Sequence, residues 1–310
     1  MYDFNNLLVE KYRPTSLNDI ILSKDDRTFF ESLKEKQEIP HLLFAGVQGS
    51  GKTSLAKIIV NDILDCQYLY INASDENGID TIRGKISGFA RTKSLDGKLK
   101  VVLLDEGDQI SLDAQKALRN IIEEFASNTR FIITCNYLFK IIPALQSRTQ
   151  IFNLTPPIEG VVQRVKEILQ KENITIGPEQ KPLLLEHIRK NLPDVRRIIN
   201  DVQKFSVIGS LQIKNEASLE FVTQIFDKIV QKYDLVKLRK EIIENEKSFS
   251  NDYRNLLKQL FEVIFKSELN YETKTNMLLV VSKGMELDAF VIDKEINCFT
   301  ALINLSRNIS

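Results

Sequence analysis

His41-Leu42-Leu43-Phe44-Ala45-Gly46-Val47-Gln48-Gly49-Ser50-Gly51-Lys52-Thr53 is the stretch that decides the fold. A short apolar run, the pattern Gly46-x-x-x-x-Gly51-Lys52-Thr53 and the helix-forming residues 54–63 predict a strand, a phosphate-binding loop and a helix. Glycines let backbone N–H groups face a polyphosphate, and the helix N-terminus adds partial positive charge. A glycine-rich turn that matches by chance is the alternative, but both the strand before the loop and the helix after it are present. The stretch therefore predicts nucleoside triphosphate binding.

Two polar residues of this loop have specific expected roles. Lys52 would reach the β- and γ-phosphates, and the Thr53 hydroxyl would be a ligand of Mg²⁺, which keeps most of its octahedral shell as water and phosphate oxygen. The residues expected to contact the nucleotide here are Gly46, Gly49, Ser50, Gly51, Lys52, Thr53 and Ser54.

A second apolar run, Lys100-Val101-Val102-Leu103-Leu104-Asp105-Glu106, has the pattern of a buried parallel strand that delivers two acids at its C-terminal edge. Asp105 is placed to hold the Mg²⁺ shell through water, and Glu106 can polarise the water that attacks the γ-phosphate. Two acids also follow strands by chance, but their distance after a phosphate loop favours the functional interpretation. The pair predicts hydrolysis as well as binding.

Two further polar residues follow apolar segments. Arg130 to Asn136 is expected to be another buried strand, and its terminal Asn136 can either orient the attacking water or begin a turn. Arg148 ends a short predicted helix, where an exposed arginine is usually only solvated. Strand and helix alternate up to residue 154, which predicts an α/β fold with a parallel sheet covered by helices on both faces.

Composition limits the partners. The chain has 310 residues, 43% of them hydrophobic and 27% charged, and its formal net charge is zero. Any affinity for nucleic acid must therefore come from a local patch. The best candidate is the basic cluster on and after the helix expected at about 79–92, although a solvated helix face is equally compatible; its members are Arg83, Lys85, Arg91, Lys93, Lys98 and Lys100.

The sequence contains few features that indicate a cellular compartment. Cys66, Cys135 and Cys298 match no zinc spacing, and such sparse thiols fit a reducing compartment. Residues 1–10 have no basic-then-apolar leader, and no apolar run has membrane-spanning length, so we expect a cytoplasmic protein.

Thr155-Pro156-Pro157 breaks the alternation and predicts a domain boundary. We expect a nucleotide-binding domain over 1–156, a helical lid over 157–212 and a helical domain over 213–310. The lid should contain helices at 158–171, 178–190 and 194–205 and no strand, with Asp194 capping the third helix. Arg196, early on that helix, is disfavoured by the helix dipole, and a nucleotide phosphate would explain its position. The last domain shows only apolar positions at helical spacing, which indicate a core or packing surface.

Several motifs together resemble the ATPase subunits of sliding-clamp loaders, which are the replication factor C small subunits and their bacteriophage counterparts within the AAA+ class. A generic AAA+ protein shares the phosphate loop but lacks the Tyr-Arg-Pro arm and the Ser-Arg pair, and the resemblance covers about Val9 to Gln203. The motifs are Glu10-Lys11-Tyr12-Arg13-Pro14, Pro40-His41-Leu42-Leu43-Phe44-Ala45-Gly46, Asn72-Ala73-Ser74-Asp75-Glu76, Gly78-Ile79-Asp80, Ile82-Arg83 and Gln146-Ser147-Arg148.

This resemblance implies a ring-like pentamer, formed with a different co-subunit, in which ATP and Mg²⁺ sit between neighbours and the last domain is a collar for oligomerisation. By similarity, Tyr12, Arg13 and Pro14 line the adenine side, Asn136 is the first sensor and Arg196 the second. Arg148 would be the finger inserted into the adjacent subunit's site. Primer-template DNA would be contacted by Arg83 and Lys85, with Arg119 a weaker candidate.

Two positions depart from the family pattern. Gly107 stands where alanine is usual after the two acids, and Thr149 follows Arg148 where cysteine is usual. Neither change removes an acid or the arginine, so we expect hydrolysis to survive. The lack of a zinc-binding cysteine set favours the phage, archaeal or eukaryotic branch, which would place the protein in a host cytoplasm, in a cytoplasm or in a nucleus respectively.

The leading hypothesis is a DNA- and clamp-stimulated ATPase that closes on a clamp with ATP, meets primer-template DNA and hydrolyses ATP to release the closed clamp. One alternative is a structural subunit that binds ATP with little turnover. Another is a different AAA+ remodeller, such as a Holliday-junction motor; that role needs an aromatic pore loop, which we do not see between Asn72 and Arg91.

Overall fold

The computed structural model describes residues 7–75, 78–92, 94, 97–207, 209–213, 219–249 and 252–308. The chain forms two compact units, Met1–Ile213 and Lys214–Ser310. Among the residues named in the motifs and the basic cluster above, Glu76 and Lys93 lie outside the described part.

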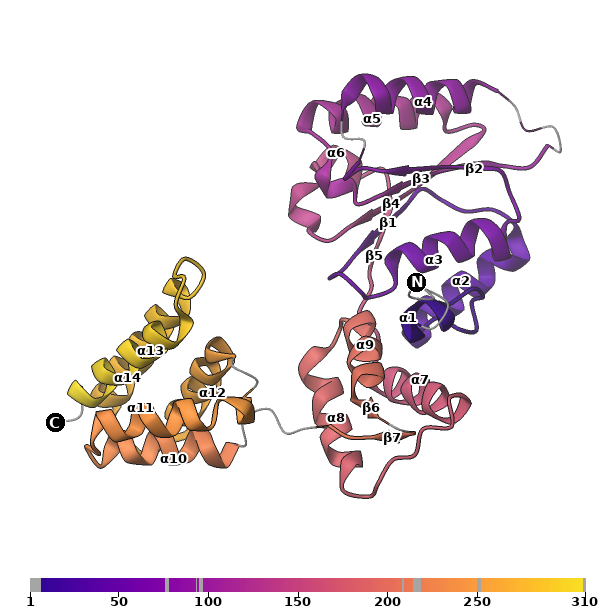
Figure 1. Cartoon of the computed structure of the whole chain (residues 1–310). Coiled ribbons are helices and arrows are strands. Elements are labelled where there is room, and N and C mark those ends of the chain that lie inside the picture. The colour runs from indigo at the N-terminus through magenta and orange to yellow at the C-terminus, as the bar shows by residue number, and fades with distance from the viewer. Residues whose placement is uncertain are drawn as a thin grey trace. The chain divides into compact units, whose positions relative to one another are not determined.

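A five-stranded parallel sheet forms the centre of the first unit (Figure 1). Its strand order is β2-β3-β4-β1-β5, which confirms the predicted α/β class. The strands are β1 (Leu42–Ala45), β2 (Tyr68–Asn72), β3 (Lys100–Asp105), β4 (Thr129–Cys135) and β5 (Gln150–Asn153). Because all strands run the same way, the segments that follow β1, β3 and β4 emerge at the same edge of the sheet.

Helices cover both faces of this sheet (Figure 1). On one face lie α4 (Ile79–Arg91), α5 (Leu112–Phe125) and α6 (Pro143–Gln146); on the other lie α2 (Lys24–Lys36) and α3 (Lys52–Ile58), which continues as a π-helical segment, Ile59–Ile63. Successive strand residues point to opposite faces, so Val102 and Leu104 pack under the first group and Val101 and Leu103 under the second. Burial on both sides explains the uninterrupted apolar run of β3.

The remainder of the first unit is mainly helical. It contains α7 (Ile158–Lys171), α8 (Gln180–Asn191) and α9 (Val195–Phe205), packed around Val161, Ile188 and Ile198, and the short α1 (Leu8–Lys11) lies against α9. The expectation of no strand in this region was wrong. Two-residue strands β6 (Ser206–Val207) and β7 (Ser210–Leu211) form an antiparallel hairpin, whose turn includes Gly209 at a φ of +75°.

The second unit is a helical bundle in its described part. Its helices are α10 (Leu219–Val230), α11 (Leu235–Glu244), α12 (Tyr253–Lys266), α13 (Tyr271–Leu287) and α14 (Lys294–Arg307). Val222, Leu257 and Val281 are completely buried between them. Asn297 donates through its side chain to the backbone oxygen of Gly284, at 2.9 Å, which joins α14 to α13. The division into three domains, with boundaries after residues 156 and 212, stays a prediction.

Short 3₁₀ segments connect several elements. They span Gly107–Gln109, Leu138–Lys140 and Glu246–Phe249. Among the helices that the structure describes, none combines the length and the apolar character needed to cross a membrane.

Gly107 allows a test of one packing constraint. A Cβ placed on Gly107 would lie 2.7 Å from Cγ2 of the buried Ile133. We predict that Gly107→Ala lowers the free energy of unfolding by about 1–3 kcal/mol, because the added methyl group overpacks this contact. Urea unfolding monitored by circular dichroism would measure the change.

Gly88→Ala is the matched control, because a Cβ at Gly88, inside α4, meets no atom within 4 Å. This substitution should stabilise the protein by about 0.5–1 kcal/mol through helix propensity. Equal effects of the two substitutions would contradict the packing explanation.

Candidate nucleotide-binding site

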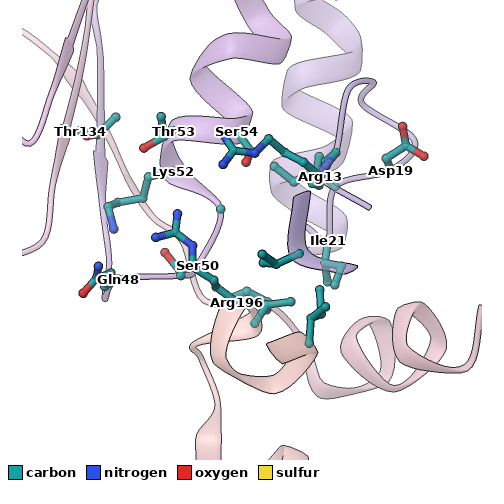
Figure 2. A pocket seen from close by; sticks show the side chains of 18 of the residues that line it. Arg13, Asp19, Ile21, Gln48, Ser50, Lys52, Thr53, Ser54, Thr134 and Arg196 are labelled. Carbon is teal, nitrogen blue, oxygen red and sulfur yellow. The ribbon is translucent and has the colours of Figure 1, made fainter. Parts of the chain in front are cut away.

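An open cleft lies where the carboxyl edge of the sheet meets α9 (Figure 2). Most of the residues expected to bind or cleave the nucleotide line it. These are Tyr12, Arg13, Pro14, Gly49, Ser50, Gly51, Lys52, Thr53, Ser54, Asp105, Glu106, Asn136 and Arg196.

The Lys52 ammonium group is held by acceptors of the loop itself. Its Nζ donates to the backbone oxygens of Gly46 and Val47, each at 2.8 Å, and to Oδ1 of Asn136 at 2.9 Å. Burial lowers the pKa of Lys52, and the nearby Asp105 carboxylate opposes this shift. Gly46 does not line the cleft but fixes this lysine through its carbonyl group. The ammonium group can bind a phosphate oxygen by exchanging one of these acceptors.

The Asp105 carboxylate is 7% exposed and accepts hydrogen bonds from hydroxyl groups on three elements. Thr53 and Thr134 donate to Oδ1 at 2.8 and 2.6 Å, and Tyr70 donates to Oδ2 at 3.0 Å. Burial and the adjacent Asp105 raise the pKa of Tyr70, so its hydroxyl group stays a proton donor. The cluster joins α3, β2 and β4 to the end of β3.

This donor set fits Mg²⁺ bound together with a nucleotide. Within the described part of the chain, no group of three or more His, Cys, Asp or Glu side chains could hold a metal ion. Mg²⁺, however, commonly takes only one or two protein oxygens and fills its shell with water and phosphate. The hydroxyl group of Thr53 beside the carboxylate of Asp105 provides those oxygens.

Glu106 has a backbone conformation that is uncommon for a residue with a side chain. Its φ is +55° and its ψ +40°, which lies in the left-handed region. Its backbone N–H donates to the Thr134 hydroxyl group at 3.0 Å. The backbone N–H of Asn136 donates to Oδ1 of the buried Asp108, at 3.1 Å. Backbone hydrogen bonds therefore hold Glu106 and Asn136, the polar residues that line the cleft after β3 and β4.

Thr134 was not among the candidates from the sequence, although it contacts both Asp105 and Glu106. It lies two residues before Asn136 and therefore on the same side of β4. That spacing could have identified Thr134 as a candidate from the sequence. Tyr70 had no comparable signal, because its role depends on how far its side chain reaches from a neighbouring strand.

The first turn of α9 approaches the phosphate loop closely. Oδ1 of Asp194 accepts from the backbone N–H of Arg197 at 2.9 Å, which confirms the predicted cap. A Cβ on Gly49 would come within 1.8 Å of this same Oδ1, and Gly49 also has a φ of +78°. Both facts restrict this position to glycine. Arg196 reaches from this turn toward the phosphate loop (Figure 2).

Tyr12 connects the N-terminal arm to α7. Its hydroxyl group donates to Oε1 of Glu172 at 2.5 Å, and the backbone oxygen of Tyr12 accepts from Arg164 at 3.1 Å. Burial, with the help of the Glu172 carboxylate, raises the pKa of Tyr12 to about 12. Apolar residues that the sequence did not single out line this part of the cleft: Val9, Ile20, Ile21, Val195 and Ile199. They offer the apolar surface that a nucleobase needs.

The remaining candidates lie outside this cleft. Arg148 follows α6 and pairs with Glu123 of α5. Arg83 is exposed on α4, and Arg119 is exposed on α5, where it contacts Asn120. The exposed Lys85 also lies on α4, and the two helices pack against each other (Figure 1). A role for these three cations in DNA binding stays a prediction.

Thr134→Val tests the hydroxyl cluster with an almost unchanged side-chain volume. We predict at least a tenfold lower rate of ATP hydrolysis, because a hydrogen bond to a charged group is worth about 1.5–3 kcal/mol. Nucleotide affinity, measured with a fluorescent ATP analogue, should change by less than about threefold, since the phosphate-binding loop is untouched.

Thr129→Val is the matched control on the same strand, because the buried Thr129 hydroxyl group has no hydrogen-bond partner among the described residues. It should leave hydrolysis unchanged. Equal losses in the two variants would show that Thr134 matters only for packing.

Comparison with known protein families identifies one match. Residues 42–157 match the model described as ATPase family associated with various cellular activities (AAA). This segment runs from β1 to just before α7 and contains the phosphate loop, both acids and Asn136.

Curated relatives match most of the chain. A protein of Sulfurisphaera tokodaii named "Replication factor C small subunit" is 37% identical over 286 residues, which cover 88% of this chain and 86% of that protein. Another of that name from Methanococcus maripaludis is 32% identical, covering 89% and 90%. A third, from Sulfolobus acidocaldarius, is 40% identical over 214 residues, covering 67% of this chain and 65% of that protein.

Solved structures show the same fold at low sequence identity. The Holliday junction branch migration motor RuvB of Thermotoga maritima matches with a TM-score of 0.52 at 19% identity, covering 94% of this chain and 91% of that chain. At this identity the likeness concerns the fold alone.

Proposed function

This chain belongs to the family of replication factor C small subunits and is a clamp-loader ATPase of the AAA class, and we propose that it uses ATP to place a sliding clamp on primer-template DNA. In this proposal, ATP favours the assembly that holds the clamp. Contact with DNA then triggers hydrolysis, which releases the closed clamp.

The proposed chemistry uses the cleft beside the phosphate loop. Lys52 would hold the β- and γ-phosphates, and Thr53 with Asp105 would hold Mg²⁺, whose charge neutralises the phosphate oxygens during transfer. Glu106 would polarise the attacking water, and Asn136 would orient it. The nucleobase would lie near Tyr12, Arg13 and Pro14, with Arg196 contacting phosphate.

One observation carries the hydrolytic part of this proposal. The Thr134 hydroxyl group donates to the Asp105 carboxylate and accepts from the backbone N–H of Glu106. One hydroxyl group is therefore hydrogen-bonded both to the carboxylate that we propose holds the metal and to the residue that we propose is the base. A site used only to bind ATP would need neither Glu106 in the cleft nor a left-handed backbone at that residue. This supports turnover over a purely structural role.

Arg148 is proposed to complete the site of a neighbouring subunit. It does not line the cleft of its own chain, and its side chain is 32% exposed. A guanidinium group supplied in trans can stabilise charge on the transferring phosphoryl group, so hydrolysis would depend on assembly. The expected assembly is a pentamer of these chains and a different co-subunit. The helical second unit would act as its collar.

A Holliday-junction motor is the second candidate, because motors of that kind share the fold. The matched RuvB structures are only 17–19% identical in sequence to this chain, whereas the matched replication factor C small subunits are 32–42% identical. We therefore retain clamp loading as the proposed function.

Steady-state ATPase assays test the proposal. The chain would be assembled with its co-subunit and assayed with and without primed DNA and clamp. We predict strong stimulation of the wild type and loss of at least about 100-fold in Glu106→Gln and Arg148→Ala, because each removes a group needed only in the transition state.

ATP binding is the control measurement and should persist in Glu106→Gln. A wild-type rate that does not respond to DNA and clamp would reject the clamp-loading function.

A further inference from the structure

The guanidinium group of Arg148 is engaged within its own chain. Its Nε donates to Oε1 of Glu123 at 2.7 Å, and one terminal nitrogen donates to the same oxygen. The other terminal nitrogen donates to the backbone oxygen of Ala144 at 2.8 Å. Two elements are thereby joined, since Glu123 belongs to α5 and Arg148 follows α6.

A cation beside Glu123 is favourable because of the position of this residue on its helix. Glu123 lies in the last turn of α5, which ends at Phe125. This turn contains no basic residue. A carboxylate there faces the negative end of the helix dipole. The Arg148 guanidinium group offsets this effect.

The backbone that carries Arg148 is held independently of this ion pair. Gln115, near the start of α5, donates to the backbone oxygen of Lys140 at 2.9 Å and accepts from the backbone N–H of Ile142 at 2.8 Å. Gln146 donates to the backbone oxygen of Ile141 at 2.7 Å. Rotation of the Arg148 side chain can therefore free the guanidinium group without unfolding α6.

We propose that Glu123 is a positioning residue that keeps the Arg148 guanidinium group on its own subunit until a triphosphate in the neighbouring copy replaces the carboxylate. The proposal rests on the function proposed above, in which Arg148 acts in trans. A triphosphate carries more negative charge than one carboxylate and accepts hydrogen bonds in pairs, so the exchange is favourable once the neighbour is close.

The exposure of the pair sets the size of the expected effect. The Glu123 side chain is 52% exposed and that of Arg148 32%. An ion pair of this kind shifts an equilibrium by about fivefold at most. Such a contact can delay the transfer of Arg148 but cannot prevent it.

Glu123→Gln and Glu123→Ala test the proposal in the full assembly. Each should raise the basal ATPase rate, without DNA, about two- to fivefold and leave the rate with DNA and clamp unchanged. Alanine should have at least the effect of glutamine, because the glutamine oxygen can still accept from Arg148. Glu124→Gln, which alters an exposed neighbour, is the matched control and should leave the basal rate unchanged.

A double-mutant cycle separates this role from a structural one. In the Arg148→Ala background, Glu123→Gln should change nothing, because its effect acts through the arginine. Melting temperatures of all variants would report any loss of folding. A Glu123→Gln effect that persists without Arg148 would overturn the proposal.

The two proposals fail in different ways. If Arg148→Ala abolishes stimulated hydrolysis but both Glu123 variants equal Glu124→Gln in basal rate, the positioning role is wrong and the trans arginine stands. If Arg148→Ala retains wild-type stimulated hydrolysis, the trans arginine is wrong, and the role of Glu123 with it.

Discussion

The buried carboxylate of Asp105 is the contact on which the geometry of the cleft depends. An ionised group with 7% exposure is costly to bury unless hydrogen bonds replace its hydration. Here Thr53, Thr134 and Tyr70 provide three donors from three elements. The same requirement that stabilises the carboxylate therefore fixes the start of α3 against β2, β3 and β4.

The phosphate loop contains a buried positive charge that also needs hydrogen-bond partners. Lys52 is buried, and its ammonium group is satisfied by two backbone oxygens and Asn136. Its acceptors therefore belong both to the loop and to the segment after β4. Gly49, which must be small to admit Asp194, lets the first turn of α9 lie against the same loop. In this way the two sides of the cleft are positioned against each other.

Much of the fold follows from local pattern. The apolar run of β3 and the glycines of the loop predict their structures because burial on both faces and backbone conformation act within a few residues. The hairpin at residues 206–211 was missed, because its two-residue strands are too short to show any alternation.

Contacts between side chains that lie far apart along the chain could not be predicted from the sequence. Tyr12 reaches Glu172 and Arg148 reaches Glu123, and neither pair follows from spacing along the chain. Tyr70 likewise meets Asp105 only because β2 and β3 pair in a register that aligns Asn72 with Asp105. Residue type predicted which groups could do chemistry, whereas tertiary packing decides which of them meet.

We propose that one active site is completed by two copies of the chain, and mixing inactive variants tests this most directly. Chains with Glu106→Gln and chains with Arg148→Ala would be assembled together in equal amounts with the co-subunit, and DNA-stimulated hydrolysis would be measured. Random neighbours should restore about a quarter of the seams between copies, since a restored seam needs an intact cleft on one side and an intact arginine on the other. Mixed assemblies as inactive as either variant alone would contradict the account.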